Sequence, residues 1–129
     1  MSRSILLDTH ILLWMRGPHG QLTDGEVRAI NSAPIRYVSA ASFWEIAILV
    51  GLGRLPDDER LFSLPHGIEL LPIEPRHCTE LVALPQIHRD PFDRMLIAQA
   101  RTDDLLLLTR DTKIIGYGRA GADCVSLQH

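Results

Sequence analysis

The sequence has little cysteine and no long apolar segment. Cys78 and Cys124 are its only thiols, and the residues after Ser4 form a short apolar run that meets Asp8, which leaves no room for the apolar core of a signal peptide. No later apolar stretch approaches the roughly 20 residues of a membrane span. We therefore expect a cytosolic (cytoplasmic) protein with reduced thiols. Cys78 beside His77 fits no zinc-ligand spacing, so we expect a buried thiol and a surface histidine.

Positive charge is also scarce, and it is carried almost entirely by one residue type. The net charge is −3 with a pI near 6.0, so bulk charge does not indicate a nucleic-acid-binding protein. Arginine nevertheless makes up all but one of the 13 basic residues. Its planar guanidinium suits phosphate, so local phosphate contacts are one interpretation. A genomic preference for arginine codons is another.

The composition is that of one globular domain. Hydrophobic residues make up 46% of the chain and charged residues 22%, which is far from the composition of a disordered protein. A chain of 129 residues is long enough to bury roughly two thirds of its unfolded surface in one core. The sequence has no internal repeat and no long linker, so we expect residues 1–129 to form a single domain.

Two kinds of apolar segment alternate along the chain. Short apolar runs predict strands at 4–9, 35–40, 67–73, 105–109 and 122–127, the last at a sheet edge. Helical patterns occupy 10–17, 22–33, 42–53, 76–84 and 91–102, with a short helix from Asp111. Thr23 and Glu26 have the spacing of a capping box, and Ser42 is expected to cap the next helix, which ends at Gly51 or Gly53. This alternation predicts an α/β fold with a parallel sheet and helices on both faces.

The alternation of strands and helices places four acidic residues at one edge of the expected sheet. In such a fold the carboxyl ends of the strands and the amino ends of the following helices lie at the same edge, where ligands bind. Asp8 ends the first strand, and Asp111 lies two residues past the fourth. Glu45 is expected in the first turn of its helix, and Asp93 at the start of another. The sequence therefore predicts that four carboxylates lie together.

Structural roles explain some of these acids. Asp90 before Pro91 is typical of a helix N-cap, and Asp93 three residues later fits a capping box or a favourable contact with the helix dipole. Asp8 lies at the margin of the core, where an unpaired carboxylate is costly. Glu45 lies in a helix that is apolar almost all round, the kind normally buried, so it needs a partner.

A cation is the partner that the energetics favour. Two carboxylates about 4 Å apart repel by roughly 4 kcal/mol at an effective dielectric constant near 20. A divalent ion removes this repulsion, and ligation by carboxylate oxygens suits Mg²⁺ or Mn²⁺ better than zinc. Such sites serve phosphoryl or phosphodiester hydrolysis, in which the metal activates water and neutralises the leaving oxygen.

The same residues also carry a family resemblance. The segments "LLDTH", "SAASFWEIAI", "RDPFDRMLIAQA" and "LLLTRD" resemble, in order and spacing, a PIN-domain ribonuclease of the VapC type, the toxin of a bacterial toxin–antitoxin pair. The resemblance covers essentially the whole chain. It implies a three-layer α/β/α sandwich, an Mg²⁺- or Mn²⁺-dependent endoribonuclease and a cognate antitoxin. It assigns the acidic quartet to Asp8, Glu45, Asp93 and Asp111, with Thr9 and Thr109 as auxiliary hydroxyls.

A mechanism follows from this resemblance. Asp8, Asp93 and Asp111 are expected to ligate the metal directly, while Glu45 positions a metal-bound water or completes the shell of a second ion. Attack by water would give a 5′-phosphate and a 3′-hydroxyl. Three arginines flank the expected edge and either guide the RNA backbone or are merely solvated: Arg89, Arg94 and Arg110.

The apolar helix at 42–52 also has two interpretations. Together with Trp14 it either packs into the core or contributes to a dimer interface or an antitoxin groove. The family resemblance favours a homodimer and an antitoxin partner.

Two rival functions are open to test. A phosphoacceptor receiver domain needs an aspartate after its middle strand, where this chain has Pro72, Ile73 and Glu74, and a late lysine, whereas Lys113 follows Asp111 in an expected helix. A non-catalytic PIN-like binding module would keep the fold but lose acids, and all four acids are present.

Overall fold

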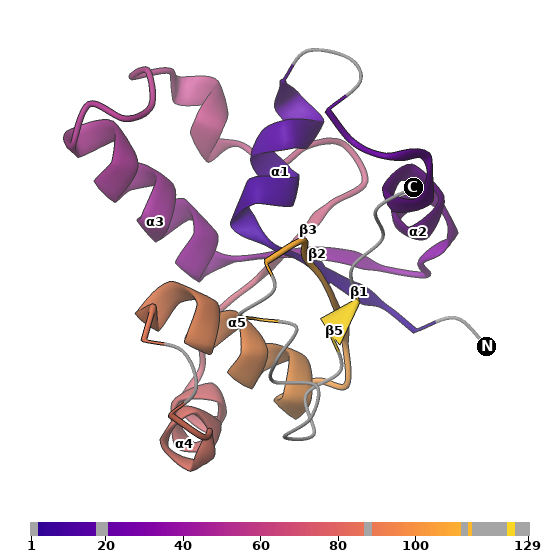
Figure 1. Ribbon diagram of the computed structural model, residues 1–129, viewed down its shortest axis with the longest axis vertical. Coiled ribbons are helices and arrows are strands. Elements are labelled where there is room, and N and C mark those ends of the chain that lie inside the picture. Colours follow the sequence, from indigo (N-terminus) through magenta and orange to yellow (C-terminus); the bar gives the residue numbers. More distant parts are fainter. Residues whose placement is uncertain (1–2, 18–20, 87–88, 112–113, 115–123, 126–129) are drawn as a thin grey trace.

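The computed structural model describes residues 3–17, 21–86, 89–111, 114 and 124–125. Strands and helices alternate along these segments (Figure 1). In chain order the elements are β1 (Ile5–Leu7), α1 (Thr9–Arg16), α2 (Asp24–Ser32), β2 (Arg36–Ser39), α3 (Ala40–Gly51), η1 (Glu59–Phe62), β3 (Glu69–Leu71), α4 (Pro75–Ala83), α5 (Pro91–Thr102), β4 (Leu106–Leu108) and β5 (Cys124–Val125). All five expected strands are present, and β5 lies at the expected sheet edge.

The strands form one parallel sheet with β1 at its centre. The strand order is β3-β2-β1-β4-β5, and every pair of neighbours is parallel. A receiver domain has the order 2-1-3-4-5, so this topology excludes that rival. Leu7 pairs with Val38 of β2 and with Leu108 of β4. The residues that follow these three positions therefore come together at the carboxyl edge of the sheet.

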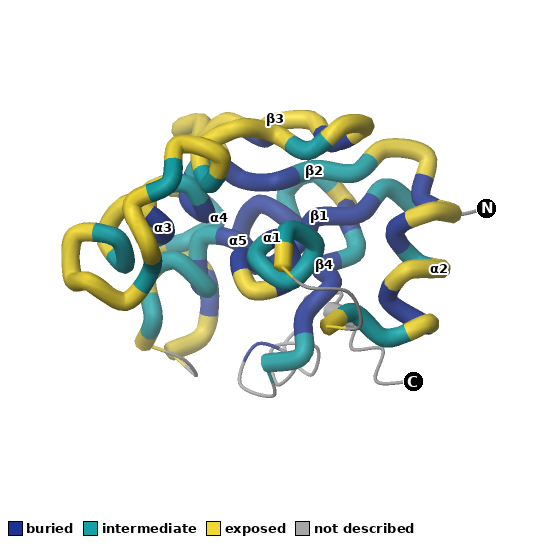
Figure 2. Tube along the Cα trace, turned by 90° about the horizontal axis from the view of Figure 1, so that it is seen from above, coloured by how far each residue is buried: buried dark blue, intermediate teal, exposed yellow. Residues whose placement is uncertain are grey.

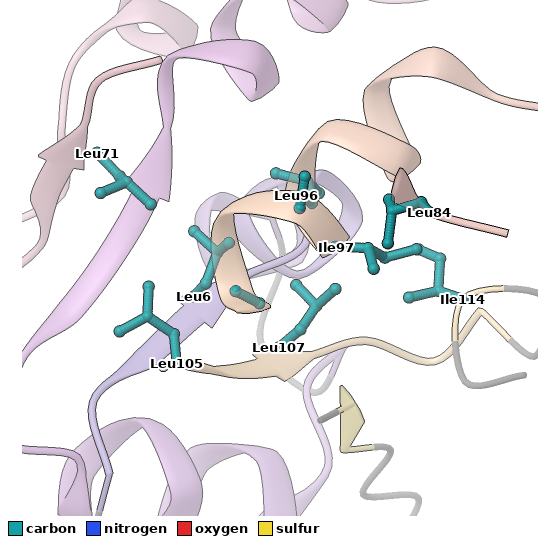
Figure 3. Close-up of a cluster of buried hydrophobic side chains, with 10 residues drawn as sticks. Leu6, Leu71, Leu84, Leu96, Ile97, Leu105, Leu107 and Ile114 are labelled. Atoms are coloured by element: carbon teal, nitrogen blue, oxygen red, sulfur yellow. The ribbon is translucent and has the colours of Figure 1, made fainter. Parts of the chain in front are cut away.

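Helices cover both faces of the sheet, as expected for a three-layer α/β/α sandwich. Figure 1 shows α1 and α3 on one side and α4 and α5 on the other. Side chains alternate across a strand, and β1 divides accordingly. Leu6 packs with Leu96 and Ile97 of α5 (Figure 3), whereas Leu7 packs with Ile11 and Ile46 on the opposite face. The central strand is buried along its length (Figure 2).

Local capping signals set several helix ends as predicted. Thr23 and Glu26 form the capping box of α2. Asp90 caps α5, because its carboxylate accepts the N–H groups of Phe92 at 2.8 Å and Asp93 at 3.2 Å. The helix then runs over Pro91–Thr102, the range that the sequence predicts. The short helix expected from Asp111 falls largely outside the described residues.

The expected cap of α3 was wrong. Ser39, the last residue of β2, accepts the N–H of Ala41 at 3.0 Å and caps the helix. Ser42 lies inside the helix and is fully buried. The helix begins at Ala40, so Glu45 lies in its second turn rather than its first.

Helix α3 is also less buried than its sequence suggests. Phe43, Ile46 and Val50 pack towards the core. Three apolar side chains on another face of the helix are open to solvent. Trp44 and Leu52 are each 62% exposed and Ile48 is 39% exposed.

The expected environments of Cys78 and His77 were reversed. Cys78 is exposed, whereas His77 is completely buried. The reason is the start of α4 at Pro75, which turns His77 inward towards α5. Its Nδ1 accepts the N–H of Glu74 at 3.0 Å, and its Nε2 lies 3.0 Å from Oδ2 of Asp103 at the end of α5.

None of the helices among the described residues is both long and apolar enough to cross a membrane.

Candidate active site

Asp8 links the central strand to the first helix. It leaves β1 in an extended conformation and caps α1, and Oδ1 accepts the N–H of His10 at 3.1 Å. Oδ2 accepts the hydroxyl of Thr109 at 2.5 Å. The residue is only 3% exposed. Burial raises the pKa of Asp8, and the negative charge of Asp111 raises it further, against the opposing hydrogen bonds from Thr109 and His10.

Thr109 connects Asp8 to Asp111. It is the first residue after β4 and is fully buried. Its Oγ1 donates to Asp8 and accepts the backbone N–H of Asp111 at 3.0 Å. Asp8 and Asp111 line one open pocket of about 310 Å³, together with His10, Trp14 and Arg110. The carboxyl ends of β1 and β4 thus bring two of the four predicted acids to one pocket.

Glu45 approaches the same edge from α3. Burial raises its pKa, and the charges of Asp90 and Asp8 raise it further, while the hydroxyl of Thr9 lowers it. The Thr9 hydroxyl also lies 2.8 Å from that of Ser42. Among the described residues, nothing forms a hydrogen bond with the buried Oε1 of Glu45. An acceptor left without a donor in this position is open to a ligand.

Asp93 lies in the first turn of α5 and is half-buried. Its backbone N–H donates to the Asp90 carboxylate at 3.2 Å. The charge of Asp90 raises the pKa of Glu45, so the first turn of α5 lies on the Glu45 side of the site. Trp44 of α3 and Phe92 of α5 meet edge to face there, with ring centroids 5.0 Å apart.

The four acids do not form a preassembled metal cage. Across the described part of the chain, no three His, Cys, Asp or Glu residues are grouped so that they could hold a metal ion. The expected close cluster of four is therefore not present, although Asp8 interacts electrostatically with both Asp111 and Glu45. Mg²⁺ usually keeps several waters and binds through one or two carboxylates. Such an ion would give Oε1 of Glu45 a partner and would reduce the repulsion between Asp8 and its neighbouring carboxylates.

The three predicted arginines have different surroundings. Arg94 is 9% exposed, and its guanidinium donates to the carbonyl oxygens of Pro85 at 2.9 Å and Leu81 at 3.2 Å. These bonds tie the start of α5 to the end of α4, and a contact of Arg94 with RNA stays a prediction. Arg89 is exposed beside Asp90, and its contact with RNA stays a prediction.

Arg110 forms an ion pair with Glu26, a residue for which the sequence predicts only a helix-capping role. Its guanidinium pairs with the fully buried Glu26, donates to the carbonyl of Gln21 at 2.6 Å and lies 4.1 Å from the ring centre of Trp14. Burial alone would raise the pKa of Glu26, but hydrogen bonds from Arg110 and from the N–H of Thr23 outweigh burial and lower it. The guanidinium is thus already paired.

Two further pocket residues were missed as site residues. His10 and Trp14 are four positions apart on α1, and their rings lie 5.8 Å apart between centroids. The signal that could have found them was their spacing, because residues four apart share a helix face. Asp8 directly precedes that helix, so the same face opens onto the acids.

Comparison with known proteins identifies relatives. A family model described as PIN domain matches residues 5–120. Ribonuclease VapC22 of Mycobacterium tuberculosis (strain ATCC 25618 / H37Rv) is 29% identical over 116 residues, which cover 86% of this chain and 89% of that protein.

Solved structures share the fold. VapBC2 from Rickettsia felis, bound to a DNA fragment from its promoter, has a TM-score of 0.72 at 13% identity and covers 97% of this chain and 99% of its own. A toxin-antitoxin complex from Klebsiella pneumoniae has a TM-score of 0.61 at 21% identity, with 86% and 89% covered. The family model spans β1 to β4, the flanking helices and all four acids, and the chain therefore belongs to the PIN-domain family.

Proposed function

We propose that this chain is a metal-dependent endoribonuclease of the VapC type, the toxin of a bacterial toxin–antitoxin pair, with residues 1–129 as one nuclease domain. PIN-domain ribonucleases depend in general on divalent metal ions. The observation that carries the proposal is the uncompensated acidity at the sheet edge. No arginine or lysine among the described residues forms an ion pair with Asp8 or Glu45.

The ion that we propose is Mg²⁺ or Mn²⁺. Asp8, Asp93 and Asp111 would hold it, directly or through waters that it keeps, with Glu45 completing the site. When bound, it would supply charge neutralisation at the scissile phosphate and a lower pKa for the attacking water. Carboxylate oxygens are the donors that these hard ions prefer.

The protein's own groups would fix the geometry of this reaction. Thr109 and the N–H of His10 hold both oxygens of Asp8, and Thr109 also fixes the backbone at Asp111. Oε1 of Glu45 is without a hydrogen-bond donor among the described residues, so it would accept a proton from the attacking water. Attack of this water on the phosphodiester would leave a 5′-phosphate and a 3′-hydroxyl.

The partners in this proposal are an RNA substrate, a cognate antitoxin and a second copy of the chain, in the cytoplasm. The exposed stripe of Trp44, Ile48 and Leu52 on α3 supports an interaction surface, since such a face is costly to leave in water. The resemblance to a toxin-antitoxin complex supports the antitoxin.

RNA cleavage by purified protein tests the proposal. Wild-type protein with Mg²⁺ should cleave RNA, and Asp8→Asn and Asp93→Asn should each lose about 100-fold or more, because even groups that only orient metal ligands contribute 10- to 100-fold. Asp57→Asn, which changes an exposed acid outside the pocket, is the matched control and should cleave normally. Equal cleavage by wild type and Asp8→Asn would contradict the proposed site.

The second candidate is a non-catalytic PIN-like binding module. The absence of a preassembled group of three ligands among the described residues favours it. It predicts RNA or protein binding without cleavage at any concentration of Mg²⁺ or Mn²⁺. The same assay separates the two functions.

A further inference from the structure

One wall of the acidic pocket is made of planar groups rather than charges. His10, Trp14 and Arg110 line the pocket together with the carboxylates of Asp8 and Asp111. The guanidinium of Arg110 covers the Trp14 ring at 4.1 Å from its centre, and the His10 ring lies 5.8 Å from Trp14 at a tilt of 41°. The three planar groups are thus neighbours along one wall of the pocket, with the His10 ring tilted against that of Trp14.

Only one member of this wall is largely open to solvent. The His10 side chain is 60% exposed. Trp14 is half-buried, and Arg110 is 27% exposed and occupied by its pair with Glu26. The face available to a ligand is therefore the imidazole of His10, with Trp14 packed beside it.

This open ring stands directly beside the proposed reaction centre. The Nδ1 atom of His10 lies 3.9 Å from Oδ1 of Asp8. A phosphate positioned at Asp8 and Asp111 would carry its nearest nucleoside within reach of this ring. The pocket volume of about 310 Å³ lies at the small end of the range for ligand sites, which suits one nucleotide unit.

We propose that His10, backed by Trp14, is a stacking platform that positions an unpaired nucleobase next to the scissile phosphate. This inference rests on the proposed ribonuclease function and adds a positioning residue to its site. Unpaired bases stack on aromatic side chains, whereas a base inside a duplex has no free face.

The wall discriminates poorly between bases, because every base has a π-face. Arg110, already paired with Glu26, adds rigidity to Trp14 rather than a free positive charge for phosphate. The platform therefore favours an unpaired strand without selecting its sequence.

Fluorescence provides a direct binding test. The chain has two tryptophans, so Trp44→Phe leaves Trp14 as the single emitter beside the platform. In EDTA at low salt, where cleavage is suppressed, this protein is titrated with a single-stranded oligoribonucleotide, an abasic strand of the same length and a blunt duplex. We expect the base-bearing strand to change Trp14 emission and to bind more tightly than the other two.

Substitutions at His10 separate stacking from charge and from folding. His10→Ala should weaken binding of the base-bearing strand by about 5- to 150-fold, the range for loss of one stacked base. His10→Phe should restore binding, and His10→Lys should not. His10→Ala keeps the backbone N–H that Asp8 accepts, and the side chain is exposed, so the fold should persist. His66→Ala, at an exposed histidine outside the pocket, is the matched control.

Cleavage kinetics with Mg²⁺ give an independent readout. His10→Ala should raise KM more than it lowers kcat, with recovery in His10→Phe. The proposal is overturned if the base-bearing strand leaves Trp14 emission unchanged, if the abasic strand or the duplex binds as well, or if His10→Lys restores binding while His10→Phe does not. Base-dependent binding without any RNA cleavage by wild-type protein would instead reject the ribonuclease function and keep the platform.

Discussion

The two ends of helix α5 carry polar clusters of opposite character, each with a buried member, His77 in one and Asp8 in the other. At its start lie Asp93 and the acidic edge around Asp8; at its end lies the His77 cluster, formed by Glu74, Arg76, His77 and Asp103. The helix has 12 residues, so the clusters are separated by about 18 Å along its axis. Both clusters remove polar groups from water, but they differ in whether each buried group has a partner.

In the His77 cluster each buried group has a partner. Glu74 N–H occupies Nδ1 of His77, so Nε2 carries the proton and donates to Asp103. Arg76 forms ion pairs with both Asp103 and Glu74. At the other end Asp8 lies close enough to Asp111 and Glu45 for their charges to interact, and Glu45 has a buried oxygen that no described residue satisfies. Matched polar groups stabilise a fold, whereas mismatched ones mark sites where a ligand completes the arrangement.

The largest expected effect separates activity from stability at Asp8. Asp8→Asn should reduce RNA cleavage by about 100-fold or more. The raised pKa means that ionised Asp8 destabilises the folded state at neutral pH. Asparagine keeps the helix cap, so thermal denaturation should show an unchanged or higher Tm. A marked fall in Tm would mean that Asp8 is a matched polar group that stabilises the fold, like those of the His77 cluster.

The opposite pattern is expected at His77. His77→Ala should lower the free energy of unfolding by about 2–4 kcal/mol, because it leaves a cavity and removes the partner of Asp103. Chemical denaturation measures this loss. Cleavage per folded molecule should stay at the wild-type level, and a large loss of kcat in fully folded variant would break the comparison.

Thr109→Val tests the link between two acids of the site. The change keeps the shape of the buried side chain but removes the hydroxyl that donates to Asp8 and accepts from Asp111. We expect a 10- to 100-fold loss of cleavage, as for other groups that orient metal ligands. Thr109→Ser restores the hydroxyl and should recover most of the activity; failure of this rescue would assign Thr109 to packing alone.

Glu26 gives the smallest effect, and that effect depends on pH. Its folded pKa lies below the ordinary value of 4.5, so its pair with Arg110 contributes stability above that pH and loses it as pH falls through the folded pKa. Glu26→Gln should therefore lower unfolding free energy by about 1–2 kcal/mol at pH 7. The gap between variant and wild type should narrow below pH 4.5. A gap independent of pH would assign the loss to the capping box.

Local signals in the sequence predicted much of the fold and less of the site. The start of α5 follows from Asp90 and Pro91, which act within one turn. The cap of α3 was misplaced because its position depends on where β2 ends, and the pairing of Ser39 with Leu71 of β3 sets that end. The pair of Glu26 with Arg110 joins residues 84 positions apart, so no spacing rule could reveal it.

The acidic residues at the sheet edge show the same difference between what the sequence predicts and what depends on packing. Parallel-strand geometry was enough to bring Asp8 and Asp111 to one pocket. It could not show that Arg94 turns inward to the carbonyl oxygens of α4 and its following residues, because this depends on how two helices pack. It also could not show that no three of these acids are grouped closely enough, among the described residues, to hold a metal ion.

The central claim is that the mismatched acids around Asp8 are completed by a divalent ion. Titration of Mn²⁺ into wild-type protein and into Asp8→Asn, followed by the electron paramagnetic resonance signal of free Mn²⁺, measures this without relying on catalysis. We expect saturable binding by wild-type protein that weakens at least about 10-fold in Asp8→Asn. Equal Mn²⁺ affinity in the two proteins, or no binding by the wild type, would contradict the account.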